Sequence, residues 1–535
     1  MNPLSDPQLQ HTLSGVFRLV VPEIVLVGTA CIVFLFGSIF NRRWIWFTTS
    51  LLGVIAAMVV AGTVKTATPE VLTTASIVPD AMGGFVRWVA LISAAVLLFI
   101  SWPEVNRSIA AEYYGCLLVA VAGTSLVGRA NDLITLFLAL ELISIPTYIL
   151  LYLPVRTKRN QEAAAKYFLL SVLSSAVLLF GFSYLYGLTG STNIAVIVDT
   201  LTKANAEVLS PMALVGIVMV IAAIGFRITA VPFHFYAPDV YEGGPGGVVS
   251  MLAVLPKIAG FVALARVLGL VGSDSRHIPF DANTQLPLLL WILAILTITI
   301  GNVLALLQDN IRRMLAYSSV AHGGYMLIGI VVACSLPDAT GNLRYGAEGL
   351  VTGPAVGGID ALLVYLVAYG LMTFGAFAVI LYLSTPERSV DAIDDLAGLG
   401  QTHPISAGTM AIFLFSLIGL PLTAGFAGKL LLFVGAFTAP ADTATMRNLY
   451  RLLAVVAAVN AAIGAYYYLR VIGVMYLRTA LNPIRSSRSA PTLIGAVALA
   501  GATLFFGIFP QPIVNAARKA APVPEIPSTT VAEAK

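Results

Sequence analysis

Charged residues are scarce in this chain of 535 residues, since Asp, Glu, Lys and Arg make up 10% of it, against about 25% in typical soluble domains. Cysteine is rarer still, and Cys31, Cys116 and Cys334 lie in or beside apolar stretches without C-x-x-C spacing. This spacing argues against a disulfide framework and a cysteine-ligated cluster. The chain also lacks a G-x-G-x-x-G after a strand, a G-x-x-x-x-G-K-[ST] and a basic stripe, which disfavours nucleotide and nucleic-acid binding.

Hydrophobic residues, in contrast, make up 58% of the chain. Apolar runs of about 18 or more residues, each able to cross a bilayer as a helix, recur from end to end. They predict an all-α polytopic membrane protein with about fourteen transmembrane helices. The N-terminus has no basic n-region, so we expect its first run to be a retained helix. The predicted spans are 15–38, 44–64, 81–101, 112–128, 131–153, 163–186, 208–231, 247–271, 286–307, 312–334, 358–384, 405–438, 449–477 and 491–511.

Basic residues in the loops predict the orientation, because cytoplasmic loops carry an excess of Lys and Arg. With the N-terminus outside, twelve basic residues lie in cytoplasmic connections and seven in the opposite loops. Both termini are therefore predicted on the outer side of a cell membrane. The twelve are Arg42, Arg43, Arg107, Arg156, Lys158, Arg159, Arg312, Arg313, Arg388, Arg478, Arg485 and Arg488, and the seven are Lys65, Arg129, Lys203, Arg276, Arg344, Arg447 and Arg451.

Glu141 interrupts the apolar run TLFLALELISIPTYILLYL near its middle. An ionised carboxylate there is unfavourable by roughly 2.5 to 3.5 kcal/mol on insertion scales, and such groups usually face the bundle interior and mark ion paths. Pro146 follows and can bend the helix beside the carboxylate. The alternative is a structural ion pair.

Two lysines also lie deep in apolar spans, Lys257 in MLAVLPKIAGFVALARVLGL and Lys429 in LFSLIGLPLTAGFAGKLLLFVGAF. Burial disfavours the charged form of an amine, so a buried lysine can load and release a proton near neutrality. Snorkelling of the amine to the interface is the alternative. The Gly and Pro residues around Lys429 predict a broken helix, which in transporters points to an ion site.

A second interrupted segment, IAAIGFRITAVPFHFYAPDVYEGGPGG, carries Arg227 and His234. Arg227 is interpreted as the electrostatic partner of Glu141, and it cannot itself release a proton. His234 lies beside the break and His322 lies in a long apolar span, where each is either a relay or a hydrogen-bonded core residue. Lys166 follows Glu162 by four residues, a spacing that also suits an ordinary surface pair.

Five motifs together resemble the N subunits of the proton-pumping NADH-quinone oxidoreductases (respiratory complex I), an antiporter-like family. They agree in order across roughly residues 110–480, whereas the first three spans and the C-terminal tail are less distinctive. The motifs are EAAAKYFLLSVLSSA (162–176), VPFHFYAPDVYEGGP (231–245), NIRRMLAYSSVAHGGY (310–325), DDLAGLGQTHP (394–404) and GLPLTAGFAGKLLLF (419–433).

The resemblance implies two inverted five-helix repeats, spans four to eight and nine to thirteen, with the seventh and twelfth helices broken. It divides the chain into an N-terminal three-helix segment (1–110), a first repeat (111–272), a second repeat (273–480) and a last helix with a polar tail (481–535). It implies no cofactor in this chain, since NADH, FMN, iron–sulfur clusters and quinone belong to partner subunits. The partners that the resemblance implies are other membrane-arm subunits, above all neighbouring antiporter-like and small membrane subunits.

By the same resemblance, Glu141, Lys257 and Lys429 match the family's charged positions on helices five, eight and twelve. Lys166, His234 and His322 fall on or beside its polar axis. The chain departs at Arg227, where the family usually has lysine, so this residue is expected to act as a fixed cation. The sequence thus predicts a proton-translocating subunit without redox chemistry of its own. The alternatives are a multisubunit cation/proton antiporter component, disfavoured by PFHFYAPDVYEG, and a structural membrane-arm subunit.

Overall fold

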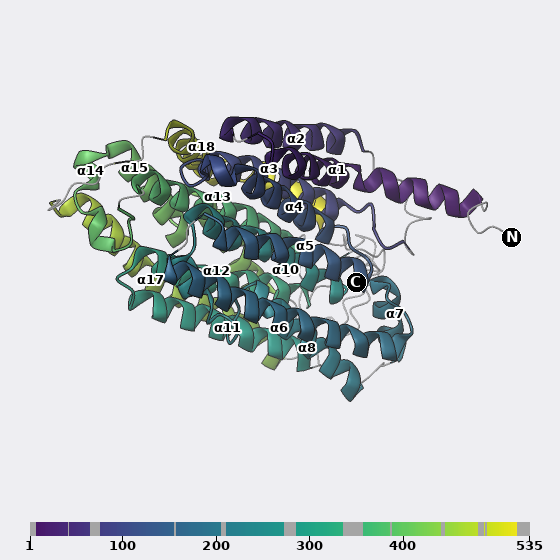
Figure 1. Cartoon of the computed structure of the whole chain (residues 1–535). Helices are drawn as coiled ribbons and strands as arrows, with labels where there is room; N and C mark the ends of the chain where they lie inside the picture. The colour runs from purple at the N-terminus through teal and green to yellow at the C-terminus, as the bar shows by residue number, and fades with distance from the viewer. Residues whose placement is uncertain are drawn as a thin grey trace.

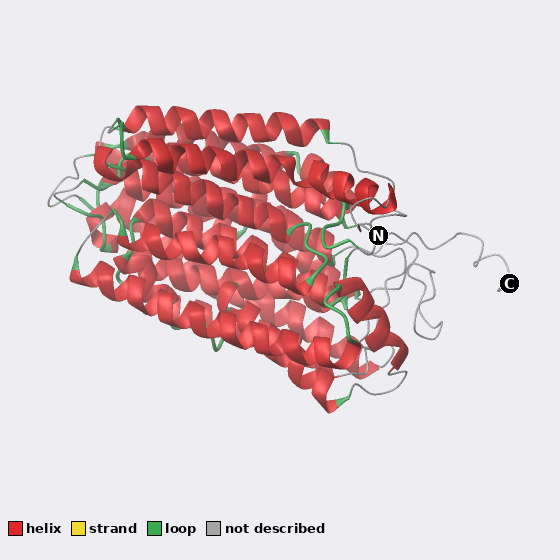
Figure 2. Cartoon of the chain, turned by 45° about the vertical axis from the view of Figure 1, so that its right-hand side comes forward, coloured by secondary structure: helices red, strands yellow, loops and turns green. Residues whose placement is uncertain are grey.

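Long helices lie nearly side by side in one bundle, with their ends gathered at two opposite faces (Figures 1 and 2). The computed structural model describes residues 7–40, 42–64, 75–154, 157–204, 210–271, 285–334, 357–385, 388–439, 444–479, 486 and 489–521. Within these residues there is no β-strand, only three isolated bridges between loops. The predicted all-α class is confirmed.

The chain order of the helices follows the predicted spans closely. The helices are α1 (Pro7–Gly37), α2 (Arg43–Thr63), α3 (Ala81–Ile100), α4 (Ala110–Val127), α5 (Leu133–Tyr152), α6 (Lys158–Thr189), α7 (Ile194–Ala204), α8 (Pro211–Arg227), α9 (Ala237–Gly243), α10 (Gly246–Val267), α11 (Gln285–Leu306), α12 (Ile311–Ala333), α13 (Ile359–Leu383), α14 (Leu399–Thr402), α15 (Pro404–Ile418), α16 (Ala424–Thr438), α17 (Ala444–Leu477), α18 (Ala490–Ile508) and α19 (Gln511–Ala520).

Twelve helices in the described part of the chain are long and apolar enough to cross a membrane. Three shorter apolar helices, α8, α15 and α16, form parts of the two segments predicted to be broken. The protein is therefore a multi-pass membrane protein, while the total of fourteen spans stays a prediction. The domain boundary predicted at 110/111 falls at the start of α4, and those at 272/273 and 480/481 lie outside the described residues.

Both predicted helix breaks are present. The helix α8 ends at Arg227, and an irregular segment leads to α9, with Thr229 in the left-handed region at φ 59°. The helix α15 ends at Ile418, where Gly419 adopts φ 92°, a conformation that glycine reaches at little cost. These breaks free backbone groups inside the bundle, which a membrane protein tolerates only where protein or water satisfies them.

The innermost helices are α10, α12 and α13, and every residue of α10 is buried. Several helices begin at side chains that accept hydrogen bonds from the first turn, as Asp80 does for α3 and Thr157 does for α6. The polar first turn of α6 explains why this helix is longer than the predicted span 163–186, because hydropathy finds the apolar part of a helix and not its end. The short helices α7, α9, α14 and α19 were not predicted, since none contains a long apolar run.

Candidate functional site

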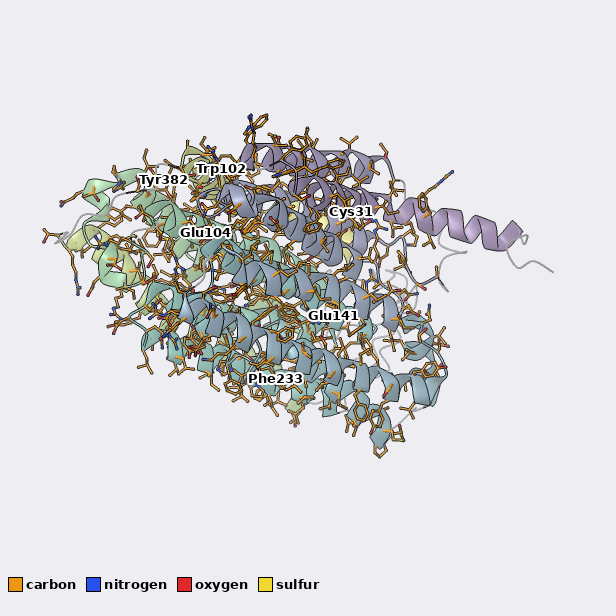
Figure 3. All side chains as sticks on the ribbon, in the orientation of Figure 1. Cys31, Trp102, Glu104, Glu141, Phe233 and Tyr382 are labelled. Atoms are coloured by element: carbon orange, nitrogen blue, oxygen red, sulfur yellow. The ribbon has the colours of Figure 1, made fainter. Side chains whose placement is uncertain are left out.

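Glu141, labelled in Figure 3, lies midway along α5. It is paired with Arg227. Nη2 of Arg227 donates to Oε1 of Glu141 at 2.9 Å, and Oγ of Ser175 donates to the same oxygen at 2.5 Å. Nη1 of Arg227 donates to Oγ of Ser144 at 2.5 Å. The structure thus brings together the two residues that the sequence predicted as partners, although they are far apart along the chain.

The break after α8 explains the position of Arg227. It is the last residue of that helix, where the helix dipole favours a cation. Its side chain is 5% exposed and that of Glu141 is 18% exposed, so water screens the pair weakly. Arg227 also faces Gly260 of α10, since a Cβ added at Gly260 would lie 3.5 Å from the Cβ of Arg227. Gly260 is one helical turn from Lys257.

Lys257 is fully enclosed, with 1% of its surface exposed. Its Nζ donates to the backbone oxygen of Ser319 and, at 2.6 Å, to Oγ of Ser319 on α12. The hydroxyl of Tyr369 lies 2.8 Å from the same Oγ, and that of Tyr241 lies 3.0 Å from it. Nζ is also 5.0 Å from the centre of the Tyr369 ring. Among the described residues no carboxylate pairs with this amine, so only neutral groups stabilise its charged form.

His322 lies on the same helix, α12, and is 1% exposed. Its Nδ1 is 2.5 Å from the hydroxyl of Tyr365, and its Nε2 is 3.1 Å from that of Tyr468. The Tyr468 hydroxyl is also bonded to Oγ of Ser318. A neutral imidazole donates a hydrogen bond from one nitrogen and accepts one at the other. The two tyrosine hydroxyls can therefore serve both nitrogens of His322, one as acceptor and one as donor.

Lys429 lies just after the second helix break and is 6% exposed. Its Nζ donates to the backbone oxygens of Leu417 at 2.8 Å and Ile418 at 3.0 Å. These are carbonyl groups that the end of α15 leaves without helical partners. The amine also lies 4.8 Å from the centre of the Tyr325 ring. As with Lys257, no carboxylate in the described residues pairs with it.

These side chains, four of them buried and Glu141 partly buried, form a polar line across the bundle. It starts at Glu141 on α5, continues through Arg227 at the first break, Lys257 on α10 and His322 on α12, and ends at Lys429 at the second break. Chemically, such a line offers two unpaired amines and one imidazole for proton exchange, with a charge pair at one end. We call these five residues the polar line.

The other two candidates are placed differently. Lys166 lies on α6 with 42% of its side chain exposed, and its Nζ is 2.6 Å from both Asp239 and Glu162. It therefore does not contact the polar line directly. His234 is 7% exposed, within the segment between α8 and α9, and its Nδ1 has no hydrogen-bond partner among the described residues.

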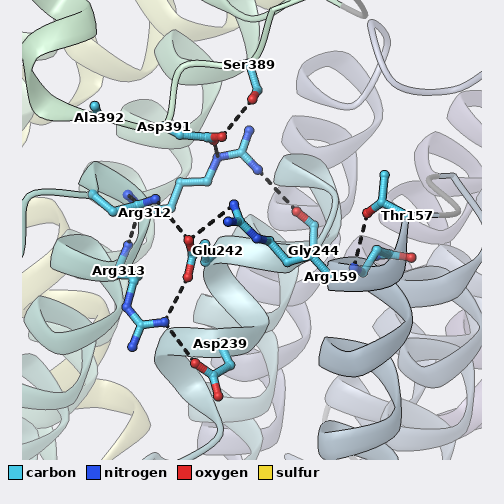
Figure 4. Close-up of polar contacts among 12 residues, drawn as sticks. Thr157, Arg159, Asp239, Glu242, Gly244, Arg312, Arg313, Ser389, Asp391 and Ala392 are labelled. Carbon is cyan, nitrogen blue, oxygen red and sulfur yellow. Dashed lines mark hydrogen bonds and ion pairs between the residues drawn. The ribbon is translucent and has the colours of Figure 1, made fainter.

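An ionic cluster surrounds α9 (Figure 4). Nη1 of Arg313 lies 2.8 Å from both Asp239 and Glu242, and Nη1 of Arg159 lies 3.3 Å from Glu242. Nη1 of Arg312 donates to the backbone oxygen of Gly244 at 3.2 Å. These bonds connect α6, α9 and α12 and fix the short helix that follows the first break.

Among the buried polar residues that were not predicted from the sequence, two sets illustrate why. The first is the set of hydroxyls around the lysines and His322, which no local pattern marks because their partners lie on other helices. The second is Glu23 on α1, which Nε of Arg87 approaches at 2.9 Å and to which Ser125 donates. Here a signal existed, because Glu23 and Arg87 are charges within predicted spans.

Comparisons with known proteins place this arrangement in context. The family model "NADH:quinone oxidoreductase/Mrp antiporter, TM" matches residues 130–339 and 349–455. The chain is similar to NADH-quinone oxidoreductase subunit N of Trichlorobacter lovleyi, at 37% identity over 83% of this chain and 84% of the relative. It is also similar to NADH-quinone oxidoreductase subunit N of Paramagnetospirillum magneticum, at 34% identity over 94% and 97% of the two chains.

Among solved structures, a chain of respiratory complex I from Thermus thermophilus has the same fold. The TM-score is 0.71 at 28% identity, and the match covers 92% of this chain and 99% of the other. The matched family region contains every residue of the polar line.

Proposed function

The chain belongs to the family of membrane subunits shared by the NADH:quinone oxidoreductases and the Mrp antiporters, and we propose that it moves protons along the polar line. It acts as subunit N of an NADH-quinone oxidoreductase, a membrane-arm subunit driven by quinone reduction elsewhere in the complex. The multisubunit antiporter is the less favoured reading, because the two relatives described above, at 37% and 34% identity, are both named NADH-quinone oxidoreductase subunit N.

The observation that carries the proposal is the pair of buried amines without carboxylate partners in the described part of the chain. Burial of a charged group without a partner costs much free energy. The group avoids this cost only if it can adopt its neutral form. Lysine avoids this cost by releasing its proton, whereas arginine does not. Lys257 and Lys429 are therefore the groups that load and unload, and Arg227 stays a fixed cation beside Glu141.

In this scheme, a proton enters from the cytoplasm, crosses Lys257 and His322, and leaves from Lys429 toward the outside. The Glu141–Arg227 pair acts as the switch. When a neighbouring charge pulls Glu141 away from Arg227, the guanidinium repels the amine on α10 more strongly and favours proton release. A change of one pKa unit corresponds to about 1.4 kcal/mol, so a small displacement suffices.

The surroundings of the polar line complete the proposal. Nδ1 of His234 has no partner in the described residues and would bind water at a proton entry beside the first break. Lys166, with its carboxylate partners Asp239 and Glu162, would lie at the protein surface near this entry. The electron-transfer groups, NADH, FMN, iron–sulfur clusters and quinone, belong to partner subunits in this proposal. Both termini lie on the outer side of the cell membrane.

Replacement of Glu141 by glutamine tests the switch. Glu141→Gln keeps the shape and a hydrogen-bond acceptor but removes the charge that holds Arg227. We expect proton pumping to slow by about tenfold, the effect of one pKa unit, while the complex still assembles. The measurement is the proton-to-electron ratio of inverted membrane vesicles, together with the amount of assembled complex.

A matched control is Glu112→Gln, because Glu112 is an exposed carboxylate at the start of α4. This variant should pump normally. Normal pumping by Glu141→Gln at normal assembly would contradict the switch.

A further inference from the structure

The helix that carries Lys257 is held at both of its ends by carboxylates that flank one other helix, α3. The residue before α3 is Asp80, and Glu104 follows the end of α3 by four residues. At 1.5 Å per residue, the 20 residues of α3 and the 22 residues of α10 span about 30 and 33 Å. The two carboxylates are thus spaced to meet the two ends of α10 when the helices run antiparallel.

Glu104 binds the first turn of α10. Its Oε1 accepts from the N–H of Gly246 at 2.5 Å, and its Oε2 accepts from the N–H of Gly247 at 2.7 Å. These N–H groups have no partner within the helix, and the helix dipole favours a negative charge beside them. Burial raises the pKa of the Glu104 carboxyl, and the Gly247 N–H, Arg312 and the Gly246 N–H all act against this rise.

The two glycines allow this approach. A Cβ at Gly247 would lie 3.0 Å from Oε2 of Glu104 and 2.9 Å from the hydroxyl of Tyr113, and one at Gly246 would lie 2.8 Å from a methyl group of Leu381. Distances this short force a neighbour to move. The contact between α10 and the carboxylate thus depends above all on the absence of a side chain at Gly247, because a Cβ at Gly246 would crowd Leu381 rather than Glu104.

Asp80 binds the other end of α10. Nη2 of Arg266, the residue before the last one of the helix, lies 2.9 Å from Oδ1 and 2.7 Å from Oδ2 of Asp80. Oδ1 also accepts from the N–H of Gly83 at 2.9 Å, which caps α3. Nε of Arg266 donates to the backbone oxygen of Gly128 at 3.0 Å. The Arg266 side chain is 3% exposed, so water competes weakly with these bonds.

We propose that Glu104 and Asp80 are positioning residues for Lys257, which fix α10 along its axis by binding both of its ends. This inference rests on the proposed function of Lys257. The lysine lies eleven residues after Gly246 and nine before Arg266, or about 16 and 14 Å from them along the helix. Its 2.6 Å bond to Ser319 tolerates only a small axial shift, and misplacement of a reacting group by about 1 Å can slow a reaction 100-fold.

The N-terminal segment thereby gains a role in transport. Its helix α3 contributes no residue to the polar line, yet it bridges the two ends of the helix that carries the central amine. The clamps are Glu104 at the N-terminal end and Asp80 at the C-terminal end of α10. Loss of either clamp leaves the packing of α10 intact but removes the charged contact that fixes the position of α10 along its axis.

The test uses the assembled complex in native membranes with four variants. Glu104→Gln and Asp80→Asn keep the shape of each side chain but place an amide where a carboxylate accepted two donors. Lys257→Met gives the reference for loss of transport, and Glu112→Gln is the matched control. We expect each clamp variant to lower the proton-to-electron ratio to nearly that of Lys257→Met, because a misplacement of about 1 Å can slow a reaction by about 100-fold, and the control to leave it unchanged.

A conservative variant separates positioning from folding. Asp80→Glu keeps a carboxylate for Arg266 and is expected to retain the ratio. An unchanged ratio per assembled complex in both clamp variants overturns the proposal, even if less complex assembles. If Lys257→Met itself leaves the ratio unchanged, the proposed function fails; if only the clamp variants leave it unchanged, the positioning role alone fails.

Discussion

Replacement of Lys257 by methionine is expected to lower the proton flux through this subunit by a factor of about 100 or more, the usual contribution of a positioned acid–base group. The amine is the only group on α10 that can exchange a proton in the polar line, and its contacts with Ser319 and Tyr369 are lost with it. Methionine has a similar length, so the helix keeps its packing. The measurement is the proton-to-electron ratio of inverted vesicles during NADH oxidation.

Folding should not confound this result. Burial of an isolated ammonium opposes folding, so its replacement by an apolar side chain is neutral or stabilising. The control is Lys158→Met, because Lys158 is exposed at the start of α6. We expect both variants to assemble and only Lys257→Met to lose transport. Normal flux in Lys257→Met would mean that protons cross without this amine.

Much of the bundle could be predicted because each membrane span must satisfy its own backbone and present apolar side chains to lipid. These constraints act within one segment, so the apolar runs and the Gly and Pro breaks predicted the spans and both interrupted helices. The helix ends were less predictable. The first turn of α6 is polar, and it becomes helical through its Thr157 cap and the bonds of Asn160 to Leu151 and Gly243.

The candidate site was predictable only as far as isolated charges reveal it. Glu141, Arg227, Lys257 and Lys429 each interrupt an apolar run, and in the structure the three cations are buried while Glu141 is partly buried. Serine and tyrosine are common in apolar spans and give no such signal, so the hydroxyls around Lys257 and His322 come together only when α9, α12, α13 and α17 pack. The hydroxyls of Ser318 and Tyr468, for example, come from helices that are distant in the chain.

The position of Lys166 could not be predicted from the sequence, although its charge was noticed. Its motif resembles the family's, but the sequence left open whether it belongs to the interior. In the structure its side chain bonds to Asp239 and Glu162 at the surface of the described bundle, because the irregular segment after α8 carries α9 to that side. Only the path of the chain through the break decides this placement.

Replacement of Arg227 by alanine is expected to destabilise the protein by about 3 to 5 kcal/mol, the usual result of removing one partner from a buried ion pair. Glu141 would keep only Ser175 as a partner, and Ser144 would lose its bond to the guanidinium. Pumping should be impaired for the same reason, since no fixed cation remains beside the carboxylate. Arg227→Lys restores a cation and is expected to retain pumping and most of the stability.

A double substitution separates charge from packing. Glu141→Gln combined with Arg227→Met removes both charges, so no uncompensated group stays buried and much of the lost stability should return. Thermal unfolding of the purified complex measures stability, and the proton-to-electron ratio measures pumping. The double variant should still pump poorly, because the switch requires both charges and not only a folded helix bundle. If Arg227→Ala and Arg227→Lys pump equally well and without impairment, then a cation at the end of α8 has no part in transport and the polar line begins at Lys257.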